Sequence, residues 1–422
     1  MKYYVHTAHL FLELARNISQ VTITKQIGVT SHSGFITVNK KYNSNLFFWY
    51  FPPKYNVETA PVVLWLQGGP GASSLLGLFL ENGPIMITEN GLTARKYHWA
   101  LENNLIYIDN PVGSGFSFTD EDGGHCDGEA CVARNLYNFL QQFFDLFPQL
   151  RCKEFYMIGQ SYAGKYIPSL ATEIHDQNLR NEKKINLRGL AMGNAFCDPI
   201  NQIDYGNYLY QLGLLDGKQR DLFLRKQEKI VNETKSENWS LAHILLNELI
   251  DGVLGNFSYF KNYTGFQTHF NFLKSNNMDN SLFFLMLDDD ATRNSIHVGN
   301  LAFNTHARTV QTHLAADIVQ SVAPKISALL DSYRIMLYNG QLDIIVAYPL
   351  TENFLRKLNF TSAEEYKAAP RKIWTVNDEI AGYYKKAGNL VEVMVRNAGH
   401  MVPMDQPLWS LDLITSFIKN KI

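Results

Sequence analysis

A serine, an aspartate and a histidine occur in this chain in the order and settings that nucleophilic catalysis requires. Ser161 lies in Gly159-Gln160-Ser161-Tyr162-Ala163-Gly164, directly after an apolar run. A serine hydroxyl is a weak nucleophile by itself, so acyl-transfer enzymes hold it on an exposed, strained turn beside a base. The small residues around Ser161 allow such a turn between a strand and a helix, and they aim the backbone N–H of Tyr162 at a developing oxyanion.

Asp343 and His400 are the candidates for the acid and the base. Asp343 follows the apolar run 334–338, and His400 follows the run 391–395. In an α/β-hydrolase the acid and the base come after the nucleophile in the chain, each in a loop after a later core strand. Taken singly, Asp343 fits a turn and His400 an ordinary loop histidine. Their joint order and placement predict a catalytic triad with Ser161.

The elements around these residues predict an α/β fold with a mostly parallel central sheet flanked by helices. Residues 33–39 and 45–51 are expected to form an antiparallel hairpin, and helical spacing of apolar residues appears in 129–147 and 166–174. Strands buried on both faces read as continuous apolar runs closed by Gly or Pro. Runs of this kind at 61–66 and 105–108 predict buried strands, and further strands are expected at 155–158, 187–192, 334–338, 371–376 and 391–395.

The alternation of strands and helices stops between residues 199 and 296, where polar helical segments appear instead. It resumes afterwards and ends in an expected helix at 407–418. We therefore expect one α/β-hydrolase core, built from 1–198 and 297–422. The mainly helical insertion 199–296 is expected to form part of the wall of the substrate cleft.

Composition excludes several classes of protein. The chain has 422 residues, of which 46% are hydrophobic and 18% charged, with a formal net charge of −2, so it is globular and has no basic face for nucleic acid. No apolar run approaches the ~20 residues that a membrane span needs. Residues 1–15 contain a weak apolar stretch broken by charged and histidine residues, so no signal segment is evident in this chain.

The four cysteines are Cys126, Cys131, Cys152 and Cys197, and their spacing does not suggest a metal site. Disulfides remain possible. Cys152 is expected at the start of the strand whose far end carries Ser161, whereas the other three lie near the opposite ends of strands. A strand of five or six residues spans ~17–20 Å, well beyond the ~7 Å reach of a disulfide. We therefore predict that Cys152 is a free, buried thiol.

Six Asn-x-Ser/Thr sequons occur, and four of them fall between residues 232 and 262. This clustering fits an exposed, glycosylated excursion. It favours the secretory pathway, with a lysosomal or extracellular destination. The sequons begin at Asn17, Asn232, Asn238, Asn256, Asn262 and Asn359.

Several long motifs follow one another along the chain. They are Trp65-Leu66-Gln67-Gly68-Gly69-Pro70-Gly71, residues 109–117, residues 159–166, Asn339-Gly340-Gln341-Leu342-Asp343 and Gly399-His400-Met401-Val402-Pro403. In this order they resemble the serine carboxypeptidase family, and most closely its vitellogenic carboxypeptidase-like branch. The resemblance covers nearly the whole chain from Ser33 onward.

The resemblance implies a cofactor-free peptidase that removes single residues from peptide or protein C-termini. It makes Ser161 the nucleophile, His400 the general base and acid, and Asp343 the residue that orients His400. The backbone N–H groups of Gly69 and Tyr162 would form the oxyanion hole. The substrate carboxylate would be held by the remaining site residues, namely Gln67, the Gly68 backbone, Glu81 and Gln160.

Gln160 departs from the family pattern, because most relatives carry an acid there. Two carboxyl groups so close can share a proton and bind the substrate carboxylate best in acid. Gln160 removes half of that pair but can still donate a hydrogen bond, so the change should tune the enzyme and not abolish it. Ala72 stands where relatives often have Cys or Gly, and 199–296 contains no cysteine, so the family's disulfides cannot be transferred. His98, His125 and His297 match no catalytic motif and are expected to be core or surface histidines.

Two other functions compete with this hypothesis. Another serine hydrolase, such as an esterase or an aminopeptidase, would share the triad but would have no use for Glu81 with Gln160 as a carboxylate anchor. A catalytically silent binding protein would keep the fold alone. The complete triad and the glycine loop favour the enzyme. The preferred side chains at the cleaved bond and the oligomeric state have no signal in the sequence.

Overall fold

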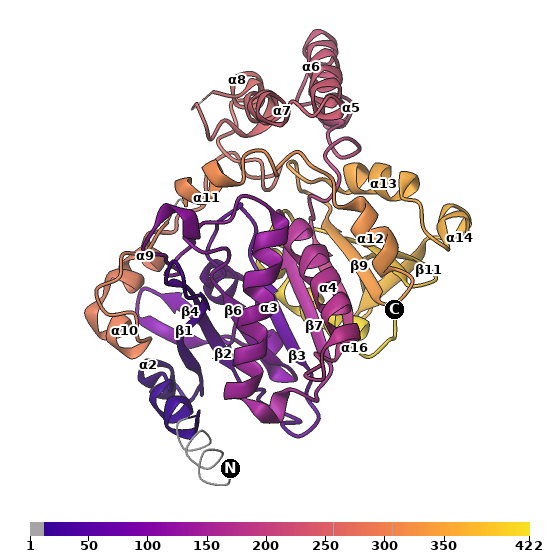
Figure 1. Ribbon diagram of the computed structural model, residues 1–422. Helices are drawn as coiled ribbons and strands as arrows, with labels where there is room; N and C mark the ends of the chain where they lie inside the picture. The colour runs from indigo at the N-terminus through magenta and orange to yellow at the C-terminus, as the bar shows by residue number, and fades with distance from the viewer. Residues whose placement is uncertain (1–11, 256, 306) are drawn as a thin grey trace.

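The computed structural model describes residues 12–255, 257–305 and 307–422, and a ten-stranded sheet runs through them (Figure 1). The order of strands across this sheet is β1-β2-β6-β3-β7-β8-β9-β12-β11-β10. Their bounds are β1 His32–Asn39, β2 Ser44–Phe51, β3 Val62–Leu66, β6 Asn104–Ile108, β7 Phe155–Gln160, β8 Leu187–Gly193, β9 Arg334–Gly340, β10 Lys372–Val376, β11 Glu379–Ala387 and β12 Leu390–Val395. A separate two-stranded sheet pairs β4 Ile85–Thr88 with β5 Gly91–Ala94.

The middle of the large sheet is parallel and its two margins are antiparallel. Strands β6, β3, β7, β8, β9 and β12 pair in parallel, whereas β1, β2, β11 and β10 join by antiparallel pairing. The predicted α/β-hydrolase architecture is confirmed, and so is the predicted hairpin, which is β1 with β2. Parallel strands end on one edge of a sheet, so the loops after β7, β9 and β12 lie along the same edge.

Helices cover both faces of the sheet, and each face has its own apolar core. One core packs the long helices α3 and α4 onto the sheet, and Figure 1 shows these two helices side by side in front of the strands. The other core packs α16 and η1 against the opposite face. The bounds are α3 Glu129–Leu146, α4 Ala163–Arg180, α16 Pro407–Ile418 and the π-helical turn η1 Gly77–Asn82.

The chain between β8 and β9 is mainly helical. In Figure 1, α5 to α8 stand above one end of the sheet, away from α3 and α4. A third apolar cluster joins them to the loop after β9 through Ile344 and Val346. The helices are α5 Tyr205–Gln211, α6 Gly217–Lys235, α7 Trp239–Leu246, η5 Asn247–Asp251, α8 Tyr259–Thr264, α9 Ser281–Asp288, α10 Asp290–Ser295, α11 Arg308–His313 and α12 Ala323–Leu329.

The remaining short helices complete the core. They are α2 Thr22–Lys25, η2 Trp99–Leu101, η3 Asp122–Gly124, η4 Pro148–Leu150, α13 Tyr348–Lys357, α14 Ala363–Ala368 and α15 Val402–Asp405. Strand β11 was not predicted, because exposed and half-buried residues dominate most of its length and only a few positions face the core. An antiparallel strand near the margin of a sheet needs no continuous apolar run, so this pattern carries a weak signal.

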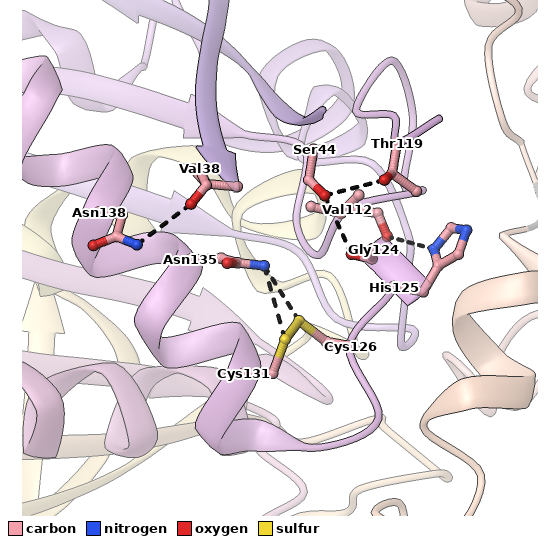
Figure 2. The surroundings of a disulfide bond; sticks show 10 residues. All are labelled: Val38, Ser44, Val112, Thr119, Gly124, His125, Cys126, Cys131, Asn135 and Asn138. Atoms are coloured by element: carbon pink, nitrogen blue, oxygen red, sulfur yellow. Dashed lines mark hydrogen bonds between the residues drawn. A yellow bond between two sulfur atoms is a disulfide. The ribbon is translucent and has the colours of Figure 1, made fainter. Parts of the chain in front are cut away.

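The cysteines correct one prediction. Cys126 and Cys131 form a disulfide beside Asn135 on α3 (Figure 2). Cys152 is free, as predicted, but it is exposed, so the expected burial is wrong. The reason is that β7 begins at Phe155, which leaves Cys152 in the surface turn before the strand. Cys197 is free and buried.

Two predictions fall wholly or partly outside the described residues. The expectation about a signal segment concerns residues 1–15, of which the first eleven are not described, and the sequon at Asn256 is not described either. The five other sequon asparagines are all exposed. Among the helices of the described ranges, none has the length and apolar character that would let it cross a bilayer.

Candidate active site

Ser161 stands on a strained turn between β7 and α4. Its backbone φ is +60°, in the left-handed region that residues other than glycine rarely adopt. The turn is held on both sides, because the Ser161 N–H donates to the Gly193 carbonyl at 2.9 Å and the Phe196 N–H donates to the Ser161 carbonyl at 3.0 Å. Such strain persists only where the surroundings impose it, and it is frequent at functional sites.

The glycine loop after β3 packs directly against this turn. A β-carbon added to Gly68 would lie 2.5 Å from the Tyr162 nitrogen and 2.7 Å from the Ser161 β-carbon. Only glycine allows so close an approach. The next residue, Gly69, has a φ of +113°. The absence of side chains at Gly68 and Gly69 therefore brings backbone N–H groups from two segments near Ser161.

Asp343 and His400 meet at the neighbouring strand ends. His400 Nδ1 lies 2.8 Å from Asp343 Oδ2, and both residues are buried. The same Asp343 oxygen accepts hydrogen bonds from Asn194 Nδ2 at 2.7 Å and from the Val346 N–H at 3.2 Å. Its other oxygen accepts from the Ile345 N–H at 3.1 Å. Both oxygens of Asp343 thus accept hydrogen bonds, and its carboxylate is held in one orientation.

Asn194, which was not predicted from the sequence, binds Asp343 and follows Gly193, the residue whose carbonyl accepts the Ser161 N–H. It follows β8, the strand between β7 and β9, and its φ is +45°. Its N–H donates to the Tyr338 carbonyl at 2.7 Å, while its side chain binds Asp343. The sequence signal that could have found Asn194 is a polar residue directly after a buried strand.

The structure places Ser161, Asp343 and His400 on the same edge of the sheet, in the loops after β7, β9 and β12.

Glu81, Gln67 and Gln160 form a second, buried cluster beside Ser161. Gln67 Nε2 and Gln160 Nε2 donate to Glu81 Oε1, at 3.2 and 3.0 Å. Gln67 is oriented by Trp65, whose Nε1 donates to Gln67 Oε1 at 2.9 Å. Gln160 immediately precedes Ser161 in the chain, so the cluster lies next to the strained turn.

The Glu81 carboxyl has an unusual electrostatic environment. Its side chain is completely buried, and burial raises its pKa to about 8, although the hydrogen bond from Gln67 acts in the opposite direction. Among the described residues, Glu81 Oε2 has no hydrogen-bond partner. A carboxyl with a pKa of about 8 is largely protonated at neutral pH, so the free oxygen can carry a proton to donate. Glu81 belongs to the π-helical turn η1, a conformation that is enriched at functional sites.

A largely apolar cavity opens beside Ser161, which is part of its lining. The core contributes Gly69, Pro70 and Tyr162 to its lining, and α7 and η5 contribute several further residues. The cavity lining does not include Gln67, Glu81 or Gln160. The apolar lining residues are Phe196, Leu246, Ile250, Val253, Leu254, Ile318, Ile345 and Val346.

A buried ion pair between Lys165 and Asp317 holds the Tyr162 side chain. Its hydroxyl donates to Asp317 Oδ2 at 2.6 Å, and Lys165 Nζ lies 2.9 Å from the same oxygen. The Lys165 side chain is completely buried. Loss of one partner of such a pair leaves an uncompensated charge in the interior. The Tyr162 ring, at the edge of the cavity, is therefore held in a defined position.

Comparison with known proteins shows the family of this chain. The sequence matches the family described as serine carboxypeptidase over residues 22–420. It is 51% identical to the venom serine carboxypeptidase of Apis mellifera over 97% of this chain and 89% of that protein. It is 48% identical to the vitellogenic carboxypeptidase of Aedes aegypti, over 96% of this chain and 87% of that protein.

The human and yeast relatives extend the comparison. The probable serine carboxypeptidase CPVL of Homo sapiens is 44% identical over 97% of this chain and 87% of that protein. The crystal structure of Kex1(delta)p, a prohormone-processing carboxypeptidase from Saccharomyces cerevisiae, has a TM-score of 0.84, with 22% identity and coverage of 96% of each chain. The latter similarity shows the shared fold. The chain belongs to the serine carboxypeptidase family and is a hydrolase with the α/β-hydrolase fold.

Proposed function

We propose that the protein removes single residues from the C-termini of peptides and proteins, with Ser161, Asp343 and His400 as its catalytic triad. The observation that carries this proposal is the buried Glu81 cluster beside the Ser161 turn. A general esterase or an endopeptidase has no need of a protonated carboxyl next to its nucleophile. A carboxypeptidase can use such a group to recognise the terminal carboxylate of its substrate.

The bond-breaking steps of this proposal give each member of the triad one role. Asp343 occupies Nδ1 of His400, which leaves Nε2 as the nitrogen that takes the Ser161 proton. Ser161 Oγ attacks the carbonyl carbon of the last peptide bond, and the backbone N–H groups of Gly69 and Tyr162 stabilise the oxyanion. His400 then protonates the leaving amine. Water, activated by the same nitrogen, hydrolyses the acyl-enzyme and regenerates Ser161.

The substrate carboxylate binds at the Glu81 cluster in this proposal. Glu81 Oε2 donates its proton to one carboxylate oxygen, and the amide groups of Gln67 and Gln160 with the Gly68 N–H supply the other polar contacts. A hydrogen bond to a charged acceptor contributes ~1.5–3 kcal/mol. The apolar cavity is lined by Ser161 but not by the Glu81 cluster, so in this proposal it takes the side chain of the penultimate residue. Residues of the segment 199–296 form part of its wall.

The test of this proposal compares blocked dipeptides that carry a free or an amidated C-terminus. Amidation removes the charge that the Glu81 cluster recognises, so KM should rise ~10- to 100-fold with a smaller change in kcat. Steady-state kinetics of both substrates measure the two constants. A serine-reactive phosphonate provides the control, because it should stop both reactions. Equal cleavage of acid and amide would identify an esterase or an endopeptidase instead.

The pH dependence of substrate binding offers a second test. Protonated Glu81 donates to the substrate carboxylate, and ionised Glu81 repels it, so binding weakens as pH rises through the pKa of about 8. KM should therefore change little between pH 5 and 7 and rise above pH 8. Gln160→Glu adds a second carboxyl beside Glu81, whose ionisation opposes the substrate charge at lower pH. The KM of the variant should rise more steeply between pH 5 and 7, and identical slopes would remove Gln160 from the carboxylate site.

We also propose that the protein enters the secretory pathway and acts in a lysosomal or extracellular compartment. Exposed glycosylation sequons and a disulfide support this proposal. Asn17, Asn232, Asn238, Asn262 and Asn359 are exposed, and Cys126 and Cys131 form a disulfide, a bond typical of oxidising compartments. Removal of N-linked glycans from the protein isolated from its natural source should reduce its mass, and an unchanged mass would contradict glycosylation.

A further inference from the structure

The segment 268–272, from the chain between β8 and β9, lies directly on His400. The Phe270 and His400 rings are stacked, with 4.9 Å between their centroids and 15° between their planes. The Phe270 carbonyl accepts the His400 N–H at 2.7 Å. A β-carbon on Gly399 would lie 2.3 Å from that carbonyl, so glycine is required where the two segments cross. Phe270 is therefore attached to His400 through both its backbone and its ring.

The neighbours of Phe270 hold this segment in place. The His269 carbonyl accepts the N–H groups of Ile344 and Ile345, at 3.1 and 3.2 Å, and these two residues follow Asp343. The Phe272 N–H donates to the Leu342 carbonyl at 2.9 Å, on the other side of Asp343. The segment is thus bonded to the loop of the acid as well as to the loop of the base. Displacement of the segment 268–272 would therefore break hydrogen bonds to both loops.

We propose that Phe270 is a positioning residue for the general base, which fixes the plane of the His400 ring and stabilises the imidazolium formed during each proton transfer. Asp343 holds the His400 ring through one hydrogen bond, at Nδ1. A single hydrogen bond does not prevent the ring from rotating about the line that joins Nδ1 to Asp343 Oδ2. A ring stacked on one face opposes this rotation. The π-face of phenylalanine also attracts a cation more than a neutral ring, so the stack is stronger when His400 carries its second proton.

The charged groups near the two rings do not cancel the stabilisation of the His400 imidazolium by Phe270. His269 stands edge-on to Phe270, at 4.8 Å and 89°, and burial lowers its pKa, so it is neutral near pH 7 and does not repel the imidazolium. Asp343 favours the imidazolium in the parent and in every variant alike. The titratable or charged groups around the stacked pair are Asp343, His269, Asp251, Lys261, Asp405 and Lys274.

The test replaces Phe270 by leucine and by tyrosine. Leucine keeps an apolar cover but lacks the π-face, so Phe270→Leu should lower kcat ~2- to 30-fold while KM stays within ~2-fold. The acid limb of kcat/KM should move to lower pH by ~0.4–1.5 units, because the imidazolium is less stabilised. Phe270→Tyr retains the π-face and should restore both. Phe270 is 41% exposed, so these changes should leave the fold intact.

Phe272→Leu is the matched control, since Phe272 is half-buried in the same segment and packs into the apolar cluster of α5 to α8. It should change neither kcat nor the acid limb. A readout without turnover is the low-field proton resonance of the His400 Nδ1–H, whose titration should shift with Phe270→Leu and not with Phe272→Leu. A rise in KM at constant kcat in Phe270→Leu would overturn the inference, because Phe270 would then be only a wall of the substrate site.

The inference rests on the proposed function, because that function assigns His400 as the base. The experiment must therefore distinguish a failure of the inference from a failure of the proposed function. Hydrolysis of p-nitrophenyl acetate needs the triad but not the Glu81 cluster. A parent protein that cleaves the ester but no peptide would refute the carboxypeptidase proposal, and a kcat loss in Phe270→Leu on the ester would still support the role of Phe270. A parent that cleaves both, with Phe270→Leu unchanged on both, would overturn the inference alone. A parent inert toward both would overturn the two together.

Discussion

Replacement of Ser161 by alanine should reduce peptide hydrolysis ~10⁶-fold and leave the protein folded. The reason is that no other group in the turn can attack the substrate carbonyl, while the backbone contacts that impose the positive φ at Ser161 involve only main-chain atoms. Alanine keeps the β-carbon and therefore adds no new strain. Steady-state kinetics, with the protein concentration taken from absorbance, measure the loss of turnover, and the thermal midpoint measures the stability of the fold.

His400→Ala should produce a loss of similar size, and the double variant should be no worse than either single variant, because the two residues act in one step. Additive losses would indicate independent roles. A Ser161→Ala protein with full activity would end the hypothesis of a serine nucleophile.

Asp343→Asn should lower kcat ~10⁴-fold. An asparagine has one acceptor oxygen where Asp343 uses two, and its NH₂ group must face a donor in either orientation. Next to His400, that NH₂ donates to Nδ1 and places the imidazole proton on Nε2. The base then cannot accept the proton of Ser161.

Asp198→Asn is the matched control for Asp343→Asn. Asp198 is also buried, but its carboxylate binds Asn201 outside the cleft. Its replacement should affect stability more than kcat. Equal losses of kcat in the two variants would show that the effect of Asp343→Asn comes from a disturbed core and not from the tautomer of His400.

In the carboxylate site that we propose, Gln160 stands where a second acid would share a proton with Glu81. Both Gln67 and Gln160 donate to one oxygen of Glu81, and in our proposal the other oxygen binds the substrate. Burial raises the pKa of Glu81, and among the described residues no second carboxyl is hydrogen-bonded to it. We therefore expect the substrate affinity of this protein to follow a single ionisation.

The strands and the strand ends could be predicted closely from the sequence. Buried parallel strands have continuous apolar runs, so their limits differ from the predicted ones by only one or two residues at most ends, as at β3 and β12. The closing helix α16 begins and ends at the predicted residues. These signals are local, because each depends on residues close together in the chain.

The sequence by itself determined the order of the core strands along the chain, the turn at Ser161 and the loops that carry Asp343 and His400. Tertiary structure decided the contacts between distant segments: Asn194 with Asp343, the pairing of Cys126 with Cys131, the exposure of Cys152, and Phe270 on His400. The physical reason is that short motifs encode backbone geometry, whereas Phe270 and His400 meet only because the fold brings together two segments 130 residues apart, with no periodicity or motif to mark the contact.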